Sequence, residues 1–194
     1  MDCGRRFPIF ILSLVAVLLL CETKAYAVLE FQVEGTYLSD LVSGAKQPSY
    51  ASTFGVSKIL FTIDSERRLG FGFAYIGYST PWMNNGTTDT LNGYDLGPTL
   101  KFDFCHKGLC SLSASYGMLV KAAYLTPTLT DSWTGQSYLY EFSLQPEISD
   151  HWRTSISVAY YYDFFTSQTV SNTTSGISVQ HTATYTLLGL VYEW

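Results

Sequence analysis

Residues 94–104, YDLGPTLKFDF, place a large apolar side chain at almost every second position and a small or polar one between. Tyr94, Leu100 and Phe102 share one parity, whereas Asp95 and Lys101 share the other. Successive side chains of a β-strand point to opposite faces, so this stretch predicts a strand with one apolar and one polar face. A strand of a water-soluble protein usually has roughly five or six residues. A tilted strand that crosses a bilayer needs about 9 to 11, which is the length found here.

The same alternation recurs after residue 27 and predicts eight long strands. Their expected ranges are 28–38, 51–63, 69–79, 94–105, 110–124, 137–148, 153–165 and 179–194. The range 51–63 is the weak member, because Ile59 and Phe61 share one face while Phe54 and Val56 share the other with Lys58. We expect a bulge in this strand, since one extra residue would bring the apolar side chains to a common face.

The connections between these strands alternate in length. The short ones are 64–68, 105–110 and 149–152, and the long polar ones are 39–50, 80–93, 126–136 and 166–178. Short turns on the side of both termini and long loops on the other side are typical of outer-membrane barrels. Pro98 and Pro146 also lie in predicted strands, where a missing N–H interrupts the ladder, but both fall near expected strand ends.

The charged residues provide an independent test of which face meets lipid. In the seven clear strands they all have the parity opposite to the large apolar residues, and with Lys58 they form a predicted lumen lining. This lining comprises Glu30, Glu34, Lys58, Asp95, Lys101, Asp103, Lys121, Glu141, Glu147, Arg153, Asp163 and Glu193. A basic residue on the lipid face costs about 2–4 kcal/mol at mid-bilayer. A soluble eight-stranded barrel has the reverse polarity. We therefore predict an all-β fold, an eight-stranded antiparallel up-and-down transmembrane β-barrel.

The N-terminus has the pattern of a secretory signal peptide. Arg5 and Arg6 precede the apolar range 7–21, and Ala25-Tyr26-Ala27 supplies small residues for cleavage. The apolar run falls short of the ~20 residues that a membrane-spanning helix needs. We expect residues 1–27 to be removed and residues 28–194 to form the barrel.

Composition narrows the class of protein further. Aromatic residues make up 16% of the chain and charged residues only 14%, which favours strands. A net charge of −5 disfavours a nucleic-acid partner. Cys105 and Cys110 remain after signal removal, and in an oxidising compartment they either form a disulfide across a hairpin turn or stay unpaired. We expect no metal site and no cofactor, because the sequence has neither a metal-spaced cluster nor a phosphate-binding glycine loop.

The C-terminal run carries a family resemblance. Leu188, Leu190, Tyr192 and Trp194 place apolar residues at every second position before an aromatic last residue. Together with the strand pattern, the chain after residue 27 resembles, nearly end to end, the small outer-membrane barrels of the OmpA, OmpX and OmpW type. The resemblance implies that these four residues are an assembly signal and that the protein is a monomer of the Gram-negative outer membrane. It also implies outer-membrane lipid, lipopolysaccharide, periplasmic chaperones and the barrel-assembly machinery as partners.

Three functions are compatible with such a barrel. The lumen charges suit an internal network that fills a narrow barrel, and their excess of acid also suits a cation-preferring pore. Trp82 and Trp133, in predicted loops, suit contact with a surface partner, a sugar or lipid headgroups. Some barrels of similar architecture modify lipid A with a His and a Ser two positions apart, but His181-Thr182-Ala183 lacks the Ser. We expect a non-enzymatic barrel whose four extracellular loops serve surface interaction or envelope integrity, with a pore as the alternative.

Overall fold

The computed structural model describes residues 28–38, 41–42, 45–46, 52–62, 69–84, 87–105 and 109–193. The predicted signal peptide, Trp194, and the side chains of Glu30 and Trp82 lie outside the described residues. The elements are β1 (Val28–Leu38), β2 (Leu41–Val42), β3 (Ala45–Lys46), β4 (Ser52–Thr62), β5 (Leu69–Asn84), β6 (Thr87–Asp103), β7 (Cys110–Leu125), β8 (Thr130–Leu144), β9 (Glu147–Ser149), β10 (Trp152–Val170) and β11 (Thr173–Glu193). Across the described ranges, no helix has the length and hydropathy that a membrane crossing requires.

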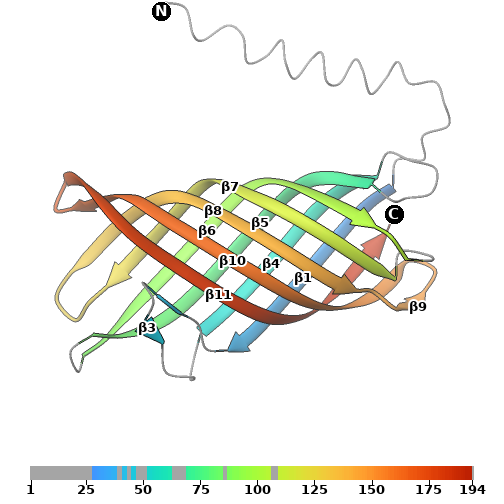
Figure 1. Ribbon diagram of the computed structural model, residues 1–194, viewed down its shortest axis with the longest axis horizontal. Coiled ribbons are helices and arrows are strands. Elements are labelled where there is room, and N and C mark those ends of the chain that lie inside the picture. The colour runs from blue at the N-terminus through green and yellow to red at the C-terminus, as the bar shows by residue number, and fades with distance from the viewer. Residues whose placement is uncertain are drawn as a thin grey trace, which may run out of the picture.

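The long strands close into a barrel. In the order β1, β4, β5, β6, β7, β8, β10 and β11, each pairs antiparallel with the next. The ring closes because β11 also pairs with β1, where Glu30 lies opposite Glu193. The predicted eight-stranded up-and-down barrel is therefore confirmed. Figure 1 shows the start of β1 and the end of β11 at one end of the barrel and the tips of the long hairpins at the other.

The outer surface is an apolar belt. Phe73 is 60% exposed, Tyr140 53% and Leu100 59%, while the residues that alternate with them on the same strands are buried. An apolar surface this extensive is unfavourable in water and favourable against acyl chains. The belt therefore marks the membrane-spanning part of the barrel.

Strand β4 differs from the sequence prediction. It pairs with both β1 and β5 without any shift in register, so the expected bulge in this strand is wrong. Phe54, Val56 and Leu60 are buried inside the barrel beside Lys58, and Phe61 faces out. The prediction failed because it assumed a polar lumen throughout, whereas part of this lumen is apolar.

The bulge occurs on β7 instead. Between Gly117 and Val120, two residues of β7 face one residue of β8, and the register with β6 shifts at the same level. Met118 and Leu119 both point outward, so Val120 takes the inward parity and Lys121 the outward one. The prediction that Lys121 lines the lumen is therefore wrong, because one extra residue inverts the parity of everything after it.

Gly97 and Pro98 lie on β6 opposite this bulge, and neither has a pairing partner on β7. The missing N–H of Pro98 thus falls where the β6–β7 ladder is already interrupted. A Cβ on Gly97 would lie 1.8 Å from the carbonyl oxygen of Tyr116. Glycine is therefore required here for the two strands to approach each other.

Three of the four predicted long loops are mostly strand. β5 and β6 pair as far as Asn84 and Thr87, and β10 and β11 pair as far as Val170 and Thr173. In the latter hairpin the turn residues Ser171 and Asn172 have φ of 46° and 66°, as a type I′ turn requires. The alternation of apolar and polar residues ends before the strands do, because a strand beyond the lipid no longer needs an apolar face.

We predict that Gly97→Ala destabilises the barrel by about 1–3 kcal/mol, because the methyl group would force β6 and β7 apart. Gly176→Ala is the matched control, since nothing lies within 4 Å of its Cβ position. Urea unfolding in detergent micelles, followed by tryptophan fluorescence, measures the difference. Equal unfolding midpoints for the two variants would contradict the close approach at Gly97.

Candidate functional site

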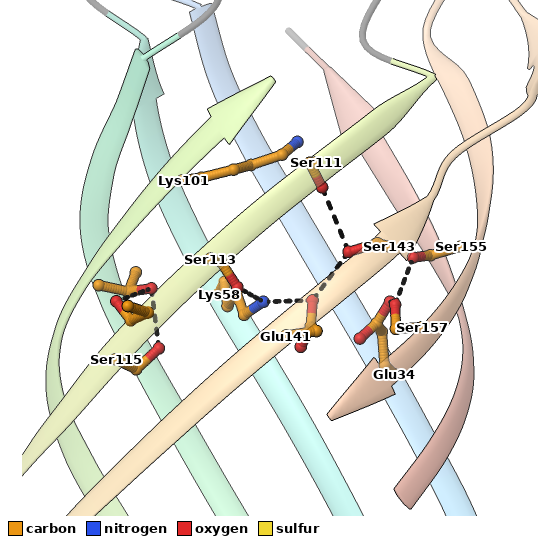
Figure 2. Close-up of polar contacts among 12 residues, drawn as sticks. Glu34, Lys58, Lys101, Ser111, Ser113, Ser115, Glu141, Ser143, Ser155 and Ser157 are labelled. Atoms are coloured by element: carbon orange, nitrogen blue, oxygen red, sulfur yellow. Dashed lines mark hydrogen bonds and ion pairs between the residues drawn. The ribbon is translucent and has the colours of Figure 1, made fainter. Parts of the chain in front are cut away.

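The barrel interior holds most of the predicted site residues. At its centre, the Lys58 ammonium lies 2.7 Å from Glu141 Oε1 and donates to Ser113 Oγ at 2.9 Å. Both side chains of the ion pair are fully buried. Figure 2 shows that these groups come from β4, β7 and β8 and point toward one another. The pair joins strands that are not neighbours, so it fixes the lumen across its width.

Serine hydroxyls extend this pair into a network. Ser143 donates to the same Glu141 oxygen at 3.0 Å, and Ser111 donates to Ser143 at 3.2 Å. On the facing wall Ser157 donates to Glu34 Oε1 at 2.6 Å (Figure 2). A buried carboxylate is stable only when such donors satisfy it, so these hydroxyls support the buried charges.

Three further contacts lie toward the short turns. Lys101 Nζ donates to Gln145 at 2.9 Å and lies 3.6 Å from Asp103. Arg153 lies 2.9 Å from Glu193 Oε1, which ties β10 to β11 where the ring closes. The turn end of the lumen is therefore also filled by paired charges.

The hairpin half of the lumen holds a different filling, which we call the plug. Its buried members are Phe54, Val56, Ile76, Tyr78, Leu91, Val120, Ala122, Trp133, Leu139, Ala159, Tyr161, Phe165, Ala183, Tyr185 and Leu187. Phe54 stacks on Tyr185 with ring centroids 4.2 Å apart and meets Tyr161 at 5.1 Å. The interior of an eight-stranded barrel is just wide enough for side chains, so these rings close it.

Asp95, Asp163 and His181 are polar side chains embedded in the plug. The Tyr161 hydroxyl contacts Asp95 and lies 2.5 Å from Asp163 Oδ1. His181 Nδ1 lies 3.3 Å from Asp163 Oδ2, and its ring is 5.0 Å from that of Tyr78. His181 is fully buried, so a lipid on the outer surface has no access to it. This arrangement holds polar groups in an apolar filling rather than presenting a reactive group.

Trp133 is not a loop residue, and its predicted exposure is wrong. It lies on β8, is 4% exposed, and stacks on Tyr124 at 4.9 Å. Trp82 lies on β5, and its side chain is outside the described residues. The expectation failed because strand β8 continues beyond the lipid, where a tryptophan can still point inward.

Glu147 is a second correction to the lumen lining. It lies on the short strand β9, all of which is exposed, beyond Pro146 and outside the ladder of β8. Among the remaining predicted lining residues, the structure buries Glu34, Lys58, Asp95, Lys101, Asp103, Glu141, Arg153, Asp163 and Glu193. Sequence reasoning missed Tyr161, although it has the same parity as Asp163 and stands between two outward tyrosines.

Two other predicted features, the cysteine pair and the C-terminal apolar run, lie toward the turn end. Cys105 and Cys110 form a disulfide, with Cα atoms 5.0 Å apart, across the turn between β6 and β7. Leu188 and Leu190 point outward on β11. In the described part of the chain, no cluster of His, Cys, Asp and Glu is arranged to hold a metal ion.

Comparison with known proteins places the fold. No model of a known protein family matches the sequence, and no curated protein matches it. The structure is similar to Neisserial surface protein A, with a TM-score of 0.59 and 14% identity over 86% of this chain and 97% of that one. It is also similar to Ail, the attachment invasion locus protein of Yersinia pestis, solved with the heparin analogue sucrose octasulfate. The TM-score is 0.53, with 13% identity over 87% of this chain and 99% of that one. The fold is that of small outer-membrane β-barrels.

We predict that Lys58→Met costs about 3–5 kcal/mol, because it removes the ammonium partner of the buried Glu141 carboxylate. The double variant Lys58→Met/Glu141→Leu should recover most of this loss, since it removes the buried charge as well. Urea unfolding in micelles measures both. A double variant as unstable as the single one would contradict the assigned role of the pair.

Proposed function

We propose that this chain is a closed, non-conducting barrel of the Gram-negative outer membrane that contributes to envelope integrity and presents long hairpins at the cell surface. The plug is the observation that carries the proposal. Stacked rings from β4, β10 and β11 fill the hairpin half of the lumen, and ion pairs fill the turn half. An ion crossing this lumen would have to displace both fillings.

A cation-preferring pore is less well supported. Its basis was an excess of acid in the lumen, but Glu141 is paired with Lys58 and Glu193 with Arg153. Asp95 and Asp163 share the Tyr161 hydroxyl within the plug, where apolar side chains exclude water. Carboxylates paired in this way stabilise the packing of the lumen and do not line a continuous aqueous path.

The proposed surface role is supported by the long hairpins and by the proteins of similar fold. The β10–β11 hairpin ends in an exposed, hydroxyl-rich segment, residues 171–176. Two proteins of similar fold carry names that refer to a surface and to attachment. Rigid strands that project polar tips beyond the lipid suit contact with another surface.

We predict that the purified barrel gives no discrete current steps in planar bilayers. Phe54→Ala/Tyr185→Ala, which removes the stacked pair of the plug, should introduce steps and serves as the positive control. Discrete currents in the parent protein that decrease in Glu141→Gln would overturn the closed barrel and favour a pore.

A lipid A-modifying enzyme was the other alternative, with His181 as its candidate residue. Because His181 is enclosed by Tyr78, Tyr161 and Asp163, we propose that the chain is not such an enzyme. We predict identical lipid A mass spectra from cells with the protein, without it, and with His181→Ala. A lipid A species that requires the protein and disappears in His181→Ala would refute this proposal.

A further inference from the structure

Lys121 is an exposed basic side chain on the outer face of the barrel. The β7 bulge turns it outward, opposite Tyr94 of β6 and Thr134 of β8. Within the described part of the chain, no carboxylate pairs with its ammonium. The bulge therefore presents an unneutralised positive charge to whatever surrounds the barrel.

A pocket of about 380 Å³ surrounds this charge. Its lining includes Tyr75, Asn92, Tyr94, Lys121 and Ser132. The ammonium, the amide and the hydroxyl are all hydrogen-bond donors, so the pocket suits an anionic group with several acceptor oxygens.

The pocket lies at the edge of the apolar belt nearest the long hairpins. Tyr75 and Tyr94 are exposed there, with ring centroids 6.4 Å apart, as in the aromatic girdle of a membrane barrel. A basic residue costs only about 0–1 kcal/mol on the lipid face at this level. Its flexible stem allows the ammonium to reach the headgroups.

Farther along the same strands, toward the short turns, the apolar belt is hollowed at a place that shares no lining residue with this pocket. Two hollows of about 550 and 700 Å³ share Leu100, Ala114 and Tyr140. Ala114 points outward between its larger neighbours Leu100 and Tyr140, with which it pairs, and its small side chain leaves room between them. The face thus combines a basic pocket at the edge of the belt with an apolar surface deeper in the bilayer.

We infer that this face binds a phosphate-bearing lipid of the outer leaflet. Lys121 pairs with the phosphate, Asn92 and Ser132 donate hydrogen bonds to its oxygens, and the acyl chains lie against the apolar belt below the pocket. The inference rests on the proposed outer-membrane location and orientation. It does not depend on whether the lumen conducts.

Amide chemical shifts of the purified barrel in maltoside micelles, which contain no phosphate, test this inference. The probes are dioctanoyl phosphatidic acid, dioctanoyl phosphatidylcholine and inorganic phosphate. We expect phosphatidic acid to shift the amides of Asn92, Ala122 and Ser132 and to bind about fivefold more tightly than the choline lipid, as one basic residue at a charged surface contributes. Lys121→Gln should abolish this preference, and Lys121→Arg should retain it.

A further variant tests whether the position of the charge matters. Lys46→Gln removes a positive charge from β3, which pairs with β2 and not with β6 or β7, and should leave binding unchanged. An unchanged lipid preference in Lys121→Gln would overturn the inference. Inorganic phosphate that binds as tightly as the lipid would overturn the assignment to a lipid. Currents in planar bilayers would count against the closed barrel and leave these outcomes unaffected.

Discussion

Closure of the strand ring is the constraint on which the rest of the structure depends. Lipid offers no hydrogen-bond partner, so every backbone N–H and C=O within the bilayer must pair inside the protein. The pairing of β11 with both β1 and β10 removes the two sheet edges that would otherwise meet acyl chains. Alternation then follows, because each strand of a closed ring has one face toward lipid and one toward the lumen.

A ring of this size creates a second requirement, since its lumen must be filled. The chain fills the centre and the turn half with charges that neutralise each other across the barrel, as in Lys58 with Glu141. It fills the hairpin half with aromatic rings, among them Phe54 and Tyr185. The ion pairs fix which strands face each other across the lumen, and the aromatic rings fill its volume. Both connect strands that do not pair with each other in the sheet. The lumen therefore resembles the core of a soluble protein surrounded by a strand ring.

The features that were predicted correctly from the sequence are those imposed by contact with lipid. The features that were predicted wrongly depend on how side chains pack in the lumen. Alternation identified the strand ring, and the bounds of β1 were predicted correctly, because the lipid face admits few polar residues. The lumen admits both kinds of residue, so Phe54 and Val56 were taken as evidence of a bulge. Trp133 was assigned to a loop because its strand continues beyond the lipid, where the outward face no longer needs to be apolar. The orientation of these side chains depends on packing between strands that are distant in the sequence, and no local sequence pattern contains that information.

The bulge on β7 connects the two faces of the barrel. In a regular strand Lys121 would point inward, and its ammonium would enter the plug, while Val120 and Ala122 would point to lipid. One extra residue reverses all three, so that Val120 and Ala122 complete the plug and the charge moves to the interface. An unpaired ladder position is costly in lipid, but Pro98, opposite the bulge, has no N–H to leave unsatisfied, and Gly97 lets the Tyr116 carbonyl approach. The bulge on β7 is therefore accommodated by Gly97 and Pro98 on β6. It allows an apolar lumen and a basic outer face to coexist at one level of the barrel.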